Sequence, residues 1–225
     1  MPPRSTVPAA PRAVLWDMDG TLVDSRAYHW RSWQEALAAD GTPVTEEQFL
    51  ATFGRKNDAI LPLWLGSDAT PERIRRVADH KEVAYRRIVA EEGLSPLPGV
   101  ADWVRRLDAA GWRQAVASSA PRLNVEVVLR AVRLESCFGA VVAAEDVRHG
   151  KPDPEVFLGA SARLGVPAPR CVVVEDVDHG IEAARRAGMK VIGVGGVAVG
   201  DVVVGSLAEL PEDAFERLLH GEVMR

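Results

Sequence analysis

Short apolar runs rich in valine recur along the chain, and no other feature of the sequence limits the possible folds as strongly. A run of this kind, bounded by turn residues and without polar alternation, is typical of a strand buried on both faces of a sheet. The runs cover residues 13–16, 113–117, 140–143, 171–174, 190–194 and 202–204.

Amphipathic stretches separate most of these runs and predict helices. They cover residues 100–110, 123–132, 154–164 and 181–187. Gly188 follows the last stretch, at a position typical of a helix C-terminus. Strands that alternate with helices imply right-handed crossovers between parallel strands. The sequence therefore predicts an α/β fold, in which a doubly wound parallel sheet is covered by helices on both faces.

Residues 25–96 interrupt this alternation, because the segment has no valine-rich run and shows a helical pattern instead. Residues 28–39 predict a first helix, and Thr45 begins a capping box that predicts a second. Thr70 and the proline after it predict the start of a long helix that ends at Glu92. The segment is therefore expected to be a helical insertion after the first strand.

Turn residues mark the borders of this insertion. Asp24 and Ser25 mark its start, and residues 94–99 (Leu-Ser-Pro-Leu-Pro-Gly) form a stretch suited to a hinge. The division that we expect is a flexible tail over residues 1–11, a core over residues 12–24 and 97–225, and a helical domain over residues 25–96.

Two patterns inside the insertion predict structural roles. Its aromatic residues are expected to form the insertion's own core, and the balanced charges over residues 72–92 are typical of a solvated helix face. The aromatic residues are Trp30, Trp33, Phe49, Phe53, Trp64 and Tyr85.

Composition excludes several classes of partner. Of the 225 residues, 47% are hydrophobic and 26% are charged, and the net charge of −5 provides no basic surface for nucleic acid. No run reaches the roughly 18 apolar residues of a membrane span, so we expect no membrane partner. Cys137 and Cys171 lie in or beside apolar segments and indicate free thiols in a reducing, cytoplasmic setting. We expect a monomer or a weak dimer.

Carboxylates gather at the carboxyl ends of two predicted strands, at the edge where doubly wound sheets bind ligands. Asp17 and Asp19 follow the first strand, and Glu175 and Asp176 follow a later one. At least three carboxylates can meet at this edge. Such a cluster suits a hard cation such as Mg²⁺, whereas no histidine or cysteine spacing supports zinc.

A hydroxyl pair and an ammonium follow two further strands. Ser118 and Ser119 follow the second run, and Lys151 lies in a loop after the third. Each polar residue alone has a common structural explanation, as a turn residue, a helix cap or a solvated loop residue. Together, at the ends of separate strands, they indicate a site for a phosphoryl group.

Four segments resemble the motifs of the haloacid dehalogenase-like (HAD) superfamily. They are residues 17–21 (Asp-Met-Asp-Gly-Thr), Ser118, residues 150–152 (Gly-Lys-Pro) and the Glu175-Asp176 pair. Residues 28–33, Lys81 with Tyr85, and residues 180–184 resemble the β-phosphoglucomutase-like subfamily. The resemblance covers residues 12–210 and implies a Rossmann-like core with an inserted α-helical cap domain.

The resemblance implies a role for each motif residue. Asp17 is expected to be the nucleophile that forms an aspartyl-phosphate, and Asp19 the acid and base. Ser118 and Lys151 are expected to stabilise charge on the transferring group. Because an alkoxide needs a proton to leave and a halide does not, an acid at Asp19 favours phosphoryl transfer over dehalogenation. The implied Mg²⁺ ligands are Asp17, Asp19 through its backbone carbonyl, Glu175 and Asp176.

The expected function is Mg²⁺-dependent hydrolysis of a small phosphorylated metabolite, namely a sugar or polyol phosphate. The candidate substrate-binding residues are His29, Arg55, Lys81 and Ser119. His29 equally fits a packed helix face and Lys81 a solvated one.

Two alternatives stay open. A β-phosphoglucomutase-type sugar phosphate mutase has the same core, but its pattern has a Lys-Asn pair after Ser118 where this chain has Pro121 and Arg122. The other alternative is a non-catalytic module that binds a phosphorylated ligand.

Overall fold

The computed structural model describes residues 10–222, and a six-stranded parallel sheet lies at the centre of this range. The strands are β1 (Ala13–Trp16), β2 (Arg113–Ala117), β3 (Ala140–Val142), β4 (Cys171–Glu175), β5 (Lys190–Gly193) and β6 (Val202–Val203). Their spatial order is β3-β2-β1-β4-β5-β6, and every neighbouring pair is parallel. The order reverses between β1 and β4, the kind of point where such sheets bind ligands. The predicted fold class is confirmed.

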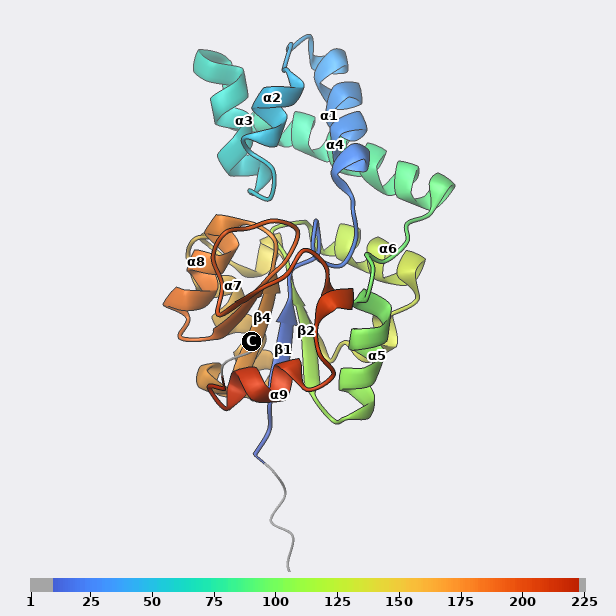
Figure 1. The fold of residues 1–225 in the computed structure, drawn as a ribbon. Helices are drawn as coiled ribbons and strands as arrows, with labels where there is room; N and C mark the ends of the chain where they lie inside the picture. The colour runs from blue at the N-terminus through green and yellow to red at the C-terminus, as the bar shows by residue number, and fades with distance from the viewer. Residues whose placement is uncertain (1–9, 223–225) are drawn as a thin grey trace, which may run out of the picture.

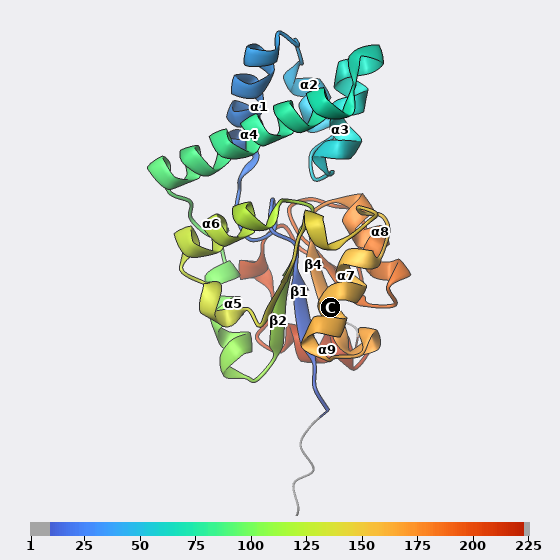
Figure 2. The same ribbon diagram turned by 180° about the vertical axis from the view of Figure 1, so that it is seen from behind.

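Helices cover both faces of the sheet (Figures 1 and 2). One face packs against α5 (Val100–Ala109), α6 (Arg122–Val132) and α9 (Ala214–Leu219), and the other against α7 (Glu155–Leu164) and α8 (Asp178–Arg186). Short 3₁₀ helices lie at Gly66–Asp68, Glu135–Cys137, Ala144–Asp146, Ala168–Arg170 and Leu207–Glu209. Across residues 10–222, no helix combines the length and the apolar character that crossing a bilayer requires.

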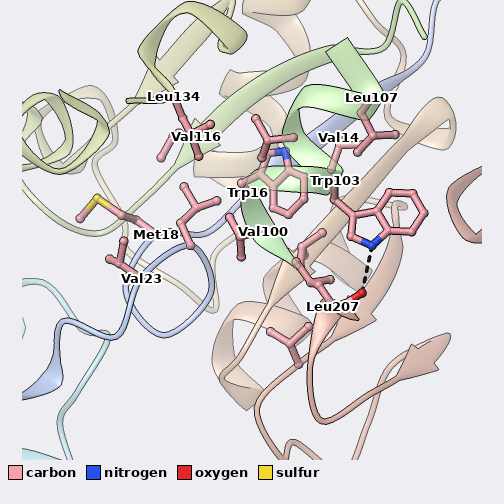
Figure 3. Packing of buried hydrophobic residues seen from close by; sticks show 14 of the residues in the cluster. Val14, Trp16, Met18, Val23, Val100, Trp103, Leu107, Val116, Leu134 and Leu207 are labelled. Carbon is pink, nitrogen blue, oxygen red and sulfur yellow. Dashed lines mark hydrogen bonds between the residues drawn. The ribbon is translucent and has the colours of Figure 1, made fainter. Parts of the chain in front are cut away.

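The pleat of the strands explains why there are two apolar clusters. Successive side chains of a strand point to opposite faces, so Val14 and Trp16 enter one cluster and Leu15 enters the other. In the first cluster, the indole N–H of Trp103 donates to the carbonyl of Leu207 at 2.9 Å, as Figure 3 shows. Both faces of the central strand are therefore buried, which accounts for its uninterrupted apolar run.

Four helices of residues 26–92 lie over the carboxyl ends of the strands (Figure 1). They are α1 (Arg26–Asp40), α2 (Glu46–Leu50), α3 (Asn57–Leu65) and α4 (Pro71–Glu92). The predicted capping box is present at Thr45, and Thr70 caps α4. Five of the predicted aromatic residues form the core of this helical layer, but Tyr85 instead packs in the larger cluster next to the sheet.

The two connections between the helical layer and the sheet pair with each other. The N–H of Leu97 donates to the carbonyl of Leu22 at 2.9 Å, and Val23 and Pro96 form an antiparallel bridge. Residues 1–9 of the expected tail lie outside the described residues.

Asp40 ties the end of α1 to α4. Its carboxylate accepts hydrogen bonds from Arg73 at 2.6 Å and from Arg76 at 2.7 Å, and its side chain is 3% exposed. These bonds, that of Arg73 above all, hold the pKa of Asp40 well below its usual range.

Asp40→Asn is therefore expected to lower the free energy of unfolding by about 1–2 kcal/mol at neutral pH, a modest loss because both arginines reach solvent. Since the pKa is lowered in the folded state, the contribution is present above about pH 4 and fades as the pH falls further. Urea unfolding at pH 7 and pH 3 checks both points. Glu92→Gln, which removes an exposed pair with Arg31, is the control and should change nothing measurable.

Candidate active site

The residues that the sequence singles out lie around one cavity between the sheet and helices α1–α4. Those that line it are Asp17, Asp19, His29, Arg55, Lys81, Ser118, Ser119, Lys151 and Glu175. Asp176 is next to them and faces a neighbouring cavity of about 300 Å³. The first cavity encloses about 50 Å³. Ligand pockets usually measure about 300–1,000 Å³, so the first cavity is small by comparison.

The loop after β1 brings Asp17 and Asp19 to this cavity. The N–H of Asp17 still donates to the carbonyl of Val174 on β4, at 3.0 Å, and the chain then turns at Gly20, which has a φ of 91°. A Cβ on Gly20 would lie 2.0 Å from a carboxylate oxygen of Asp176. Glycine is required here for both reasons, because the turn needs a positive φ and the carboxylate needs the space.

Three carboxylates and one ammonium form the centre of the site. The Nζ of Lys151 lies 2.5 Å from Asp17 Oδ1 and 2.8 Å from Glu175 Oε2. One carboxylate oxygen from each of Asp17, Glu175 and Asp176 lies within 4.8 Å of the others. Thr21 donates from its hydroxyl to Asp176 at 3.0 Å and orients it.

Burial and crowding perturb these groups. Burial raises the pKa of Glu175 well above its usual value and that of Asp176 to about 7, and the charge of Asp17 adds to both shifts. Burial also raises the pKa of Asp17, against the opposing effect of Lys151. The pKa of Lys151 rises, because the charges of Asp17 and Glu175 outweigh the effect of burial. Three carboxyl groups thus crowd one ammonium, and a further cation beside them would favour their ionised forms.

The cluster fits a hard divalent cation. Within the described residues, Glu175 Oε1 is buried without a hydrogen-bond partner. A Cβ on Gly180 would lie 2.1 Å from the Glu175 carboxyl carbon, so the absence of a side chain there leaves room for this carboxylate. The ligand atoms are all oxygens, the type that Mg²⁺ prefers.

The carboxylate of Asp19 is held by the helical layer. Its Oδ1 lies 2.5 Å from the hydroxyl of Ser25 and 3.1 Å from His29 Nε2. The His29 ring stacks on Tyr85 with centroids 4.1 Å apart, and is buried. Burial raises the pKa of Asp19, but His29, Ser25 and Lys81 together outweigh it, so the pKa lies below its usual value. Asp19 is therefore ionised at neutral pH in this state.

Two serines directly after β2 line the same cavity. The hydroxyl of Ser118 accepts a hydrogen bond from the N–H of Ala120 at 3.0 Å, and its own N–H donates to Val142 at 3.0 Å. Ser118 is buried and Ser119 is half-buried. Within residues 10–222 this hydroxyl accepts a hydrogen bond but donates none, so it can donate to a ligand oxygen.

The wall formed by the helical layer contains Lys81 and Arg55, which sequence analysis singled out, and two polar residues that it missed. Lys81 is buried as well as charged, and its Nζ lies 5.2 Å from the centre of the Trp33 ring. Glu82 and Asn57 also line the cavity, although the charge pattern predicted a solvated face for Glu82. That prediction is wrong for Glu82, which is 6% exposed. Arg55 lines the cavity but is exposed to solvent.

Comparisons with known proteins identify the family of the chain. A family model described as haloacid dehalogenase-like hydrolase matches residues 14–194. The fructose-1-phosphate phosphatase YqaB of Escherichia coli (strain K12) is 35% identical over 188 residues, which cover 80% of this chain and 95% of that protein. The β-phosphoglucomutase of Bacillus subtilis (strain 168) is 29% identical over 192 residues, 82% of this chain and 83% of that one.

A solved structure shows the same fold. It is a mutant of CbbY from Rhodobacter sphaeroides in complex with xylulose-(1,5)bisphosphate, with a TM-score of 0.80 and 30% identity over 89% of this chain and 96% of that one. Because the family model spans most of the chain and this structure shares its fold, the chain belongs to the haloacid dehalogenase-like hydrolases, among the β-phosphoglucomutase-like enzymes.

Proposed function

We propose that the protein is a Mg²⁺-dependent phosphohydrolase of a small phosphorylated metabolite, a sugar or polyol phosphate. The observation that carries this proposal is the buried ion pair between Asp17 and Lys151, beside two further carboxylates at one cavity. Such a site offers a nucleophile and positive charge to a phosphoryl group. The phosphatase name of the relative YqaB supports the same reaction.

In this proposal, Asp17 attacks phosphorus and forms an aspartyl-phosphate, while the alcohol leaves. Lys151 and the Ser118 hydroxyl donate to the phosphoryl oxygens and stabilise their charge. Asp17, Glu175, Asp176 and the backbone carbonyl of Asp19 would hold Mg²⁺, which when bound neutralises negative charge on the phosphoryl group.

Asp19 changes its protonation between the two steps. As an acid it gives a proton to the leaving oxygen. As a base it then takes one from the water that attacks phosphorus, which breaks the bond to Asp17 and releases inorganic phosphate. In the state described here it is ionised, which suits the second step. The negative charge of an incoming phosphate raises the pKa of a nearby carboxyl group and so favours the protonated form that the first step needs.

We infer that residues 25–96 are a cap that opens and closes on the core formed by residues 12–24 and 97–225. The cavity of about 50 Å³ is too small for a sugar phosphate. Bending near the paired connections at Leu22 and Leu97 would open it. Closure then excludes water and brings His29 and Lys81 to the substrate.

Two observations favour hydrolysis over mutase chemistry. Pro121 lines the cavity at a place where the mutase pattern has a lysine. The guanidinium of Arg122 pairs with Asp146 and does not line the cavity. A non-catalytic module is disfavoured, because the expected nucleophile, acid, ammonium and hydroxyl all lie at the site.

The test is phosphate release from a panel of sugar and polyol phosphates. We expect steady release with Mg²⁺, a loss of at least about 100-fold with EDTA, and recovery when Mg²⁺ is restored. Incubation with β-glucose 1-phosphate and a bisphosphate activator should yield no glucose 6-phosphate. Absence of release across the panel, or release that EDTA does not affect, would contradict the proposal.

A further inference from the structure

The cap wall of the cavity carries a carboxylate that the proposed reaction does not use. Glu82 lies on α4 directly after Lys81. The exposed fraction is 8% for the side chain of Glu82 and 4% for that of Lys81. The Nζ of Lys81 lies 2.8 Å from Glu82 Oε1. Burial raises the pKa of Glu82, but Lys81 and Asn57 outweigh this effect and lower the pKa below its usual value. The carboxyl group is therefore ionised at neutral pH.

Three donors hold this carboxylate in place. Besides Lys81, Asn57 donates to Oε1 at 2.6 Å, and Asn124 of the core helix α6 donates to Oε2. The amide oxygen of Asn124 accepts from Arg86 at 3.0 Å, which fixes the orientation of the amide. A carboxylate has about four acceptor positions, so one remains for a hydroxyl of a molecule in the cavity.

The Glu82 carboxylate also sets the net charge of the cap wall, because it pairs with Lys81. Among the described residues that line the cavity, the ammonium and guanidinium groups belong to Arg55, Lys81 and Lys151. Lys151 is engaged at the reacting end, and Glu82 neutralises Lys81. Arg55 is exposed, so water screens its charge.

A phosphate and a hydroxyl would meet this wall very differently. A hydroxyl donates a charge-assisted hydrogen bond to a carboxylate. A phosphate dianion has no proton to donate to Glu82, and Lys81 offers it little net attraction because Glu82 already neutralises that ammonium. Removing the dianion from water against this wall is therefore unfavourable. The wall therefore suits an uncharged, hydroxyl-bearing group.

We propose that Glu82 is a specificity-determining residue, which accepts a hydroxyl at the far end of the substrate and rejects a second phosphate there. The enzyme then takes monophosphate esters of hydroxylated metabolites in preference to bisphosphates. This inference rests on the proposed function. Both kinds of ligand occur among similar proteins: the name of YqaB gives a monophosphate, fructose 1-phosphate, and the CbbY mutant binds a bisphosphate.

Equilibrium binding tests the proposal without turnover. In an Asp17→Asn background with Mg²⁺, titration calorimetry compares fructose 1-phosphate with fructose 1,6-bisphosphate, which differ by the phosphate on C6. We expect the monophosphate to bind at least about tenfold more tightly. Glu82→Gln in the same background should shift the ratio of the two dissociation constants at least about tenfold toward the bisphosphate.

Two control variants separate charge from packing. Glu126→Gln removes an exposed carboxylate from α6 and should leave the ratio unchanged. Asn124→Ala removes a link between cap and core but keeps the charge of Glu82, so it should weaken both ligands alike. Circular dichroism checks that each variant is folded.

Three outcomes would overturn the proposal. They are an unchanged ratio in Glu82→Gln, a parent protein that binds the bisphosphate as tightly as the monophosphate, and binding of neither compound. Failure of the proposed function would appear in a different experiment, as absence of phosphate release by the wild-type protein. The dissociation constants are measured without turnover and do not depend on that result.

Discussion

Replacement of Asp17 by asparagine is expected to lower kcat for phosphate release by about 10⁴-fold or more. An amide of the same shape cannot attack phosphorus, so the aspartyl-phosphate no longer forms. Lys151 keeps its ion pair with Glu175 at 2.8 Å, so its ammonium is not left buried without a partner. The fold is therefore expected to persist, which circular dichroism checks beside the phosphate assay.

Asp108→Asn provides the matched control for this experiment. It makes the same chemical change at an exposed position of α5 and should retain wild-type turnover. Undiminished activity in Asp17→Asn would show that another group is the nucleophile.

The sheet could be predicted from the sequence because its strands are buried on both faces. Val14 and Leu15 point to opposite clusters, and both are fully buried, so apolar residues are required at consecutive positions. The predicted ends of the strands differ from the observed ones by one residue at most.

Two helices were missed for local reasons. In α3, Pro62 lies inside the helix, and an internal proline normally argues against a helix. The N-cap residue Lys56 makes no side-chain capping bond, so the sequence has no capping signal for this helix either. The helix α9 has six residues and depends on burial of Phe215 against the sheet. A helix this short is stabilised by tertiary packing, which the local sequence does not show.

The core side of the candidate site could be predicted for a topological reason. Carboxyl ends of parallel strands meet at one edge, so Asp17, Ser118 and Glu175 lie together although they are far apart in the chain. The side of the site formed by helices α1–α4 could not be predicted in this way, because no topological rule positions its side chains. Glu82 is buried because α4 packs across α6 and meets Asn124, whereas a solvated helix face has the same sequence of charges.

This difference explains why the general reaction could be inferred from the sequence and the selectivity could not. The groups proposed for phosphoryl transfer stand on strand ends, whose positions the fold dictates. The groups proposed to recognise the substrate, such as Glu82, depend on how the cap docks on the core.

Replacement of Asp19 by asparagine is expected to produce a loss that depends on the leaving group. For a sugar phosphate, kcat/KM should fall by about 10²–10⁴-fold, because the alkoxide leaves without a proton from Asp19. For p-nitrophenyl phosphate, the first step should be largely spared, since nitrophenolate leaves unprotonated. Steady-state assays on both substrates measure the difference, with Asp108→Asn again as the control.

The second step distinguishes this role from mere support of the cap through His29 and Ser25. Without Asp19 to take a proton from water, the phosphoryl group transferred from p-nitrophenyl phosphate should stay on Asp17. A burst of about one nitrophenolate per enzyme, followed by slow turnover, is then expected in stopped-flow measurements. A variant that loses activity equally on both substrates and shows no burst would contradict the acid–base role, because loosening of the cap would explain such a result.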